Sequence, residues 1–201
     1  MKNIKYDFNT VIDRHGTNSL KWDLFDDDLP MWVADMNFAT APSVTDAMAR
    51  RVAHPIFGYF FPSDAYYDSI IRWHRDRNGV EGLTPEAIGY ENGVLGGLIS
   101  AMNVLCSRGD HVLVHSPTYI GFTHSLENNG YHIVHSPLVK DESGLWRMDL
   151  QDMEDNLKAY DIHTAIFCSP HNPCGRVWEP WEIRKAMDLF ERYGVKVISD
   201  E

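Results

Sequence analysis

The sequence of 201 residues has few cysteines and no long apolar run, and both features narrow what the protein can be. Its 3 cysteines are too few and too scattered for a disulfide framework, which favours a reducing cytoplasm. No apolar stretch approaches the ~20 residues that a membrane-spanning helix needs, and residues 1–6 lack the apolar core of a secretory signal. We therefore expect a cytoplasmic protein with no membrane partner.

Basic residues are in the minority. The chain has 18 Lys and Arg against 29 Asp and Glu, which gives a formal net charge of -11 at pH 7. Proteins that bind nucleic acids need a basic surface to meet the phosphates, so we expect no nucleic-acid partner. Hydrophobic residues make up 44% and charged residues 23%, as in an ordinary globular protein.

Several motifs that indicate a particular cofactor, metal or nucleophile are absent from the sequence. The sequence has no Gly-x-Gly-x-x-Gly fingerprint, no Cys-x-x-Cys or His-Glu-x-x-His metal motif, and no Gly-x-Ser-x-Gly nucleophile elbow. His111 and His115 share one strand face but lie ~13 Å apart at ~3.3 Å per residue. His132 and His135 fall on opposite strand faces. We therefore expect no metal site.

The hydrophobic pattern divides the chain in two. Residues 1–45 are predicted to form an irregular arm and part of a small domain, and residues 46–201 the first part of a large domain. Helices are expected after N-caps at Ser43 and Ser63. Further helices are expected over about 94–106, 120–128, 150–158 and 181–193, and strands over 88–91, 111–115, 131–134, 164–168 and 195–199. This alternation predicts an α/β fold with a mostly parallel sheet flanked by helices.

The position of the last predicted strand bears on completeness. It ends at Ser199, two residues before the last residue, Glu201. Ligands of open α/β sheets bind beyond the carboxyl ends of the strands. A domain seldom stops where its site begins, so we expect the chain to be the front portion of a longer one.

One candidate site is the start of the helix predicted near residue 94. A strand, a turn at Gly93 and a helix start follow one another, and the free N–H groups of Val94 and Leu95 together with the helix dipole would attract an anion. The glycines at 93, 96 and 97 are equally compatible with close packing, so this segment alone leaves both interpretations open.

Three further candidates follow strand ends. Tyr119 comes after a rigid Ser-Pro turn and has a ring suited to stacking on a flat ligand, although a half-buried core tyrosine fits as well. Asn172 lies between two prolines, where its amide is suited to bonding a ligand oxygen; a turn without function is the alternative. Asp200 follows the last strand in an apolar frame. Its carboxylate would pair with a cation such as a protonated pyridine nitrogen, unless it is merely exposed.

Taken together, these features resemble a known group of enzymes. In this order and spacing they resemble the fold-type I enzymes that use pyridoxal 5′-phosphate (PLP), the aminotransferase class I/II superfamily, and within it the MalY/PatB-like branch of cystathionine β-lyases. The likeness is carried by residues 29–36 (LPMWVADM), 57–59 (FGY), 169–173 (SPHNP) and 197–201 (VISDE). It implies that residues 46–201 are the first part of a PLP-binding large domain with a PLP-transferase-like fold, truncated at its C-terminal end.

The resemblance assigns roles around the cofactor. It implies that the backbone N–H groups of Val94 and Leu95 bind the phosphate and that Tyr119 stacks on the pyridine ring. Asn172 would hydrogen-bond the 3′ oxygen of the ring, and Asp200 would keep the ring nitrogen protonated.

Two further roles lie near the N-terminus. The resemblance implies that Tyr59 reaches the cofactor phosphate of a neighbouring subunit, and therefore that the protein is a homodimer. Ala34 would lie near the carboxylate of an amino-acid substrate. Asn37 departs from the branch, which usually has Asp after this Met.

The implied activity is carbon–sulfur β-elimination, which converts a substrate such as cystathionine to pyruvate, ammonia and a thiol. An aminotransferase of the same fold and a regulatory, binding protein like MalY remain alternatives. No catalytic residue is expected within the chain, because the Schiff-base lysine should lie beyond Glu201. Lys185 is on a predicted helix and Lys196 is inside a predicted strand, so neither replaces it. The chain alone is therefore expected to be inactive.

Overall fold

The computed structural model describes residues 6–25 and 29–201. Residues 1–5, most of the segment that lacks the apolar core of a secretory signal, lie outside the described residues. The chain forms two compact units, residues 1–61 and 62–201. No helix of the described residues is long and apolar enough to cross a membrane.

The described residues of the first unit form two helices, α1 (Leu20–Asp23) and α2 (Pro42–Val52). Helix α1 was not predicted, because its single turn has no apolar period. The predicted N-cap at Ser43 is wrong: α2 begins at Pro42, since proline fits the first helical position without losing a hydrogen bond. Two cations hold the arm, with Arg14 Nη2 2.6 Å from Asp35 Oδ2 and Lys21 Nζ donating to the Asp35 carbonyl at 2.8 Å.

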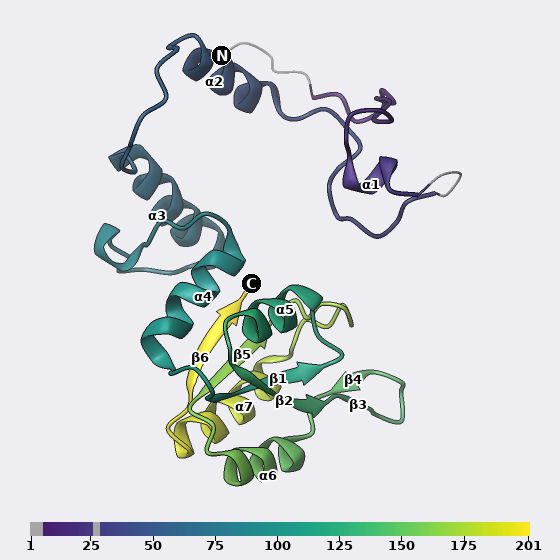
Figure 1. The fold of residues 1–201 in the computed structure, drawn as a ribbon, viewed down its shortest axis with the longest axis vertical. Helices are drawn as coiled ribbons and strands as arrows, with labels where there is room; N and C mark the ends of the chain where they lie inside the picture. Colours follow the sequence, from purple (N-terminus) through teal and green to yellow (C-terminus); the bar gives the residue numbers. More distant parts are fainter. Residues whose placement is uncertain (1–5, 26–28) are drawn as a thin grey trace. The chain divides into compact units, whose positions relative to one another are not determined.

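The second unit carries the remaining elements (Figure 1). They are α3 (Asp64–Asn78), η1 (Pro85–Ala87), α4 (Val94–Leu105), β1 (His111–Ser116), α5 (Ile120–Asn128), β2 (His132–Pro137), β3 (Val139–Lys140), β4 (Trp146–Arg147), α6 (Leu150–Tyr160), β5 (Thr164–Cys168), α7 (Pro180–Arg192) and β6 (Lys196–Asp200).

Four of these strands form one parallel sheet in the order β2-β1-β5-β6. The predicted α/β fold with a parallel sheet flanked by helices is therefore confirmed. Every residue of β5 is buried, as expected for a strand covered on both faces. The register pairs Cys168 with Asp200, so the carboxyl ends of β5 and β6 lie level with each other.

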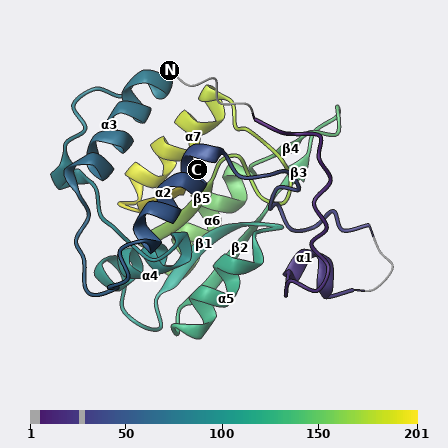
Figure 2. The same ribbon diagram turned by 90° about the horizontal axis from the view of Figure 1, so that it is seen from above.

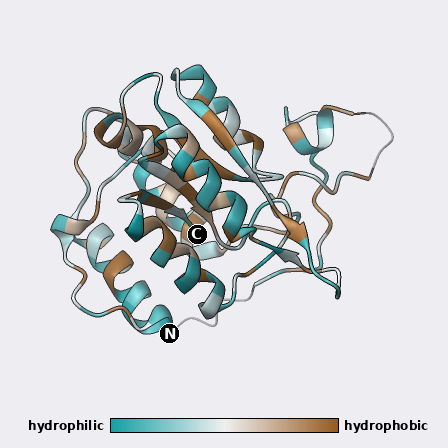
Figure 3. Cartoon of the chain, turned by 90° about the horizontal axis from the view of Figure 1, so that it is seen from below, coloured by the Kyte–Doolittle hydropathy of each residue, from teal (hydrophilic) through white to brown (hydrophobic). Residues whose placement is uncertain are grey.

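Helices lie on both faces of the sheet (Figure 2), and alternating side chains of its strands pack against them. On one face, Val112 and Val114 of β1 pack in a cluster with buried residues of α4 and α5; on the other, Leu113 packs with residues of α6 and α7. Figure 3 shows the apolar strands between helices that carry both apolar and polar segments. Burying each such side chain contributes about 1.5–3 kcal/mol, so the two clusters fix the sheet on which the site is built.

Two predictions about local structure are wrong. Residues 88–91 form no strand, because no strand among the described residues pairs with them. The hairpin of β3 and β4 was missed, because strands of two residues show no alternation. Its turn is held by the Asp141 carboxylate, which accepts from the N–H groups of Ser143 and Leu145.

Candidate active site

A pocket of about 380 Å³ lies where α4 begins and β6 ends. Four of the predicted site residues line it, namely Val94, Leu95, Tyr119 and Asp200, together with Asn92, Gly93, Gly96 and Phe122. The first and the last of these residues, Asn92 and Asp200, are more than 100 positions apart in the sequence. The fold therefore brings a helix amino terminus, an aromatic ring and a carboxylate to one small space.

The start of α4 has the features of an anion site. Gly93 precedes the helix with φ 89 and ψ 156, and no side chain caps this end. The first backbone N–H groups of a helix have no partner within the helix, and the helix dipole adds a partial positive charge there. Val94 is 69% exposed, so the helix start remains accessible from the pocket. This is the arrangement that receives phosphate groups in many proteins.

Replacing Gly93 by alanine should destabilise this turn. Its φ of 89 is unfavourable for an L-residue, while nothing lies within 4 Å of the position that the new Cβ would occupy. The cost is therefore that of the backbone alone, about 1–3 kcal/mol, measurable by urea unfolding. Gly96→Ala is the matched control, because Gly96 lies within the helix in open space and should gain helix propensity. Equal effects of the two substitutions would contradict this account.

Tyr119 stands at the N-cap of α5 with its side chain 37% exposed. Its ring packs edge-on against the buried ring of Phe122, with 5.3 Å between the ring centroids. Aromatic rings prefer this geometry, which leaves a face of the tyrosine ring available to a flat ligand. Phe122 was not among the predicted site residues, although its position three residues beyond Tyr119 places it in the same helical turn.

Asp200 is the last residue of β6, not the residue beyond the strand as predicted, because the ladder with β5 continues through it. The Ser169 N–H donates to its carbonyl at 2.9 Å. Its carboxylate Oδ2 accepts from the Cys168 thiol, with 3.5 Å between sulfur and oxygen. Burial raises the pKa of the Cys168 thiol and the bond to Asp200 raises it further, so the thiol stays protonated at neutral pH and donates to the carboxylate.

Asn172 does not line the pocket in this structure; its side chain is exposed. The backbone N–H of Asn172 lowers the pKa of the Cys168 thiol, against the larger effect of burial, and this cysteine in turn contacts Asp200. The loop that carries Asn172 is pinned by His171, whose N–H donates to the Arg176 carbonyl at 2.7 Å and whose ring is buried against Trp178, 5.6 Å between centroids. The loop also starts beside Asp200, because the Ser169 N–H donates to the Asp200 carbonyl.

A cluster of charges fixes the far end of this loop. The Arg176 guanidinium bonds the carboxylate of Glu182, which is only 3% exposed, and also donates to the Trp146 carbonyl at 2.9 Å. Arg147 Nη1 lies 3.0 Å from the same Glu182 carboxylate. The nearby carboxylates, with Asp141 first, raise the pKa of the Arg147 guanidinium. These bonds tie the loop to β4 and α7.

Two predicted site residues belong to the first unit. Tyr59 is fully exposed and Ala34 is exposed as well. Their roles toward a partner subunit's cofactor and a substrate carboxylate stay predictions.

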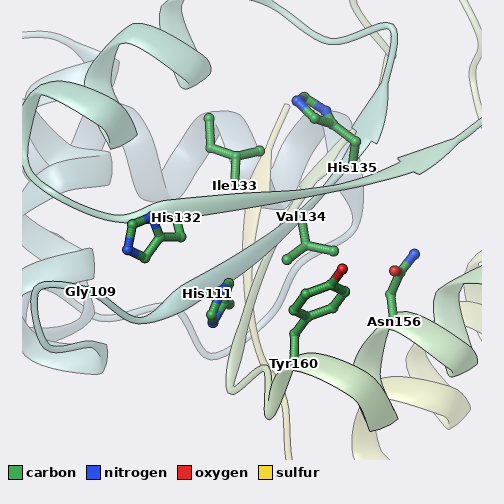
Figure 4. A pocket seen from close by; sticks show the side chains of 8 residues that line it. All are labelled: Gly109, His111, His132, Ile133, Val134, His135, Asn156 and Tyr160. Atoms are coloured by element: carbon green, nitrogen blue, oxygen red, sulfur yellow. The ribbon is translucent and has the colours of Figure 1, made fainter.

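A second pocket, of about 580 Å³, lies near the amino ends of β1 and β2, away from the one at the strands' carboxyl ends (Figure 4). His111 and His132 are register partners with 5.4 Å between their ring centroids, and the Tyr160 ring lies 5.3 Å from that of His111. His135 points to the other side of β2. Within residues 6–25 and 29–201, no group of three or more His, Cys, Asp or Glu side chains is placed to hold a metal ion.

Comparison with known proteins adds independent findings. The family model described as aminotransferase class I and II matches residues 29–201. Cystathionine beta-lyase PatB of Bacillus subtilis is 39% identical over 96% of this chain and 51% of its own length. A PLP-bound putative aminotransferase from Clostridium difficile superimposes with a TM-score of 0.90 at 36% identity, covering 98% of this chain and 52% of its own. The PLP-bound C-S lyase from Staphylococcus hominis gives 0.89 at 30% identity, with 99% and 52% covered. The chain spans about half the length of the relatives it matches.

Proposed function

Since the chain belongs to the aminotransferase class I and II family, we propose that it supplies the cofactor-gripping part of a PLP-dependent carbon–sulfur β-lyase of the cystathionine type. The family resemblance predicted from the sequence is confirmed. One observation carries the proposal: Val94, Leu95, Tyr119 and Asp200 meet at a single pocket at the carboxyl end of the sheet.

The residues of this pocket fit PLP by their chemistry. The uncapped start of α4 offers backbone N–H groups to a phosphate. The Tyr119 ring offers a face to a planar heterocycle, and the Asp200 carboxylate offers a negative charge to a protonated ring nitrogen. Asn172, in the loop that follows β5, would bond the 3′ oxygen.

In this proposal each residue has a defined task. When bound, PLP supplies an electron sink for the negative charge that develops at the Cα of the amino acid. Asp200 would hold the proton on the ring nitrogen, which strengthens that sink. The Cys168 thiol donates to Oδ2 of Asp200 and so would orient this carboxylate. Tyr119 fixes the plane of the ring, and the helix start anchors the phosphate.

The lysine that would carry the cofactor is not supplied by the candidates in this chain. Lys185 lies on α7 with its ammonium group 5.2 Å from the centroid of the Trp181 ring, and Lys196 is the first residue of β6, at the end of the strand opposite Asp200. Neither of these lysines lines the pocket. The expectation that the Schiff-base lysine follows Glu201 therefore stands as part of the proposal.

We further propose a homodimer in the cytoplasm that acts on an amino-acid substrate. The full exposure of Tyr59 supports the dimer, because a side chain that reaches a neighbouring subunit's phosphate must project from its own unit. Ala34, also exposed, would then lie near the substrate carboxylate.

Incubation of the whole protein with PLP and cystathionine tests the activity. We expect pyruvate, ammonia and a thiol to form without any added keto acid, because β-elimination needs no amino-group acceptor. Pyruvate can be measured with lactate dehydrogenase and NADH, and the thiol with a disulfide reagent. Heat-treated protein with PLP is the control, since free PLP catalyses slow elimination.

An aminotransferase is the second candidate, supported by the similarity to the Clostridium difficile protein. It would show strict dependence on a keto-acid acceptor, and that result would overturn the lyase. Absence of both reactions in protein that binds PLP would favour a regulatory protein of the MalY kind.

A further inference from the structure

Gly121 lies directly beneath the ring of Tyr119. It is the second residue of α5 and is buried. A Cβ built at this position would stand 2.3 Å from Cε1 and 2.7 Å from Cζ of Tyr119, both far inside van der Waals contact. The same Cβ would stand 3.0 Å from Cδ1 of Leu95 on α4. Glycine is therefore the one residue over which the observed ring position is possible.

This contact joins two parts of the pocket that are distant in sequence. Leu95 belongs to the start of α4, and Tyr119 caps α5. Both side chains meet over the bare Cα of Gly121, while Phe122 supports the Tyr119 ring from its edge. A methyl group at residue 121 would displace the tyrosine ring and press on Leu95.

We infer that Gly121 is a positioning residue, which seats the Tyr119 ring in the plane where it stacks on the cofactor. The inference rests on the proposed function, because the ring that Gly121 positions is the one that would contact PLP. Gly121 itself would touch no cofactor atom; it acts through Tyr119 and Leu95.

The expected signature separates positioning from a structural role. The backbone of Gly121 has no positive φ, so alanine suits its helical position and raises helix propensity. The clashing atoms are the far end of a side chain that is 37% exposed, so the ring can swing outward without breaking the core. Gly121→Ala should therefore keep or raise the unfolding midpoint while it weakens ligand binding. A residue with only a structural role would move stability and binding together.

The test uses pyridoxine 5′-phosphate, which has the ring and the phosphate but no aldehyde and so forms no Schiff base with lysines. Its dissociation constant is measured by quenching of tryptophan fluorescence in the wild type, Gly121→Ala, Tyr119→Ala and the double variant. We expect Gly121→Ala to weaken binding about fivefold, the range of one lost aromatic contact. In the Tyr119→Ala background the same substitution should cost clearly less, because the ring it displaces is already gone and only the contact with Leu95 remains.

Gly97→Ala is the matched control. It is also a helical glycine near the pocket, yet its Cβ would meet only Glu91 at an ordinary 3.6 Å, so binding should stay unchanged. Equal affinity of the wild type and Gly121→Ala, or the same loss with and without Tyr119, would overturn the inference. A wild type that does not bind the probe at millimolar concentration would instead overturn the cofactor assignment, on which the inference depends.

Discussion

Replacing Asp200 by alanine should remove most of the turnover of the whole protein while leaving it folded. Under the proposed function this carboxylate keeps the ring nitrogen protonated, and a preorganised charge at such a place accounts for about a hundredfold or more in rate. The fold should survive, because Asp200 is tied to the sheet through its backbone. The Cys168 thiol, which now contacts the carboxylate, has a second acceptor in the Pro170 carbonyl at 3.3 Å.

The measurement is the rate of pyruvate formation from cystathionine at saturating PLP, beside the unfolding midpoint of each variant. Asp200→Asn keeps the shape without the charge and should be nearly as slow as the alanine variant. Asp188→Ala removes an exposed carboxylate from α7 and should be as active as the wild type. Activity of Asp200→Ala close to the wild type would remove Asp200 from the role at the ring nitrogen.

The fold could be predicted where the hydrophobic pattern of an element extends over several residues. The strand around Leu113 and the strand around Ile166 show continuous apolar runs, and helices separate them, so a parallel sheet followed. The hairpin around Asp141 could not be predicted, because its strands are too short for periodicity and its stability comes from side-chain bonds to Arg147. Residues 88–91 have strand-like composition, but a strand exists only where a neighbour completes its hydrogen bonds.

The residues of the candidate site also fall into those that the sequence indicates and those that only the folded structure reveals. Val94, Tyr119 and Asp200 could be found from the sequence because each adjoins the end of a predicted element, where parallel sheets gather their ligands. Gly121 and Cys168 could not, because their relevance depends on tertiary placement. Cys168 meets Asp200 only through the register of β5 and β6, 32 positions apart, and the need for glycine at 121 depends on where one ring lies.

A buried histidine near the carboxyl end of β1 is expected to make the stability of the protein depend on pH. His115 is 3% exposed and packs against Phe167 and Trp178. The ring of His171 lies 6.5 Å away, and within the described residues neither His115 Nε2 nor His171 Nδ1 has a hydrogen-bond partner. Arg176, over the Trp178 ring, is a further positive charge nearby. Burial first, and His171 second, lower the pKa of His115 from 6.5 to about 4.

We therefore expect stability to fall as the pH drops below 6.5. In that range the unfolded chain binds a proton at residue 115 and the folded protein does not, so acid favours unfolding. Between pH 7 and pH 4.5 the loss from this residue is about 2.5 kcal/mol, and above pH 7 it vanishes. Urea unfolding across this window measures it, while carboxylates titrate mainly below it. His115→Gln should flatten the slope whatever it does to stability at pH 7, whereas His124→Gln, at an exposed position on α5, should leave the slope intact. An unchanged slope in His115→Gln would show that the buried ring accepts its proton without unfolding.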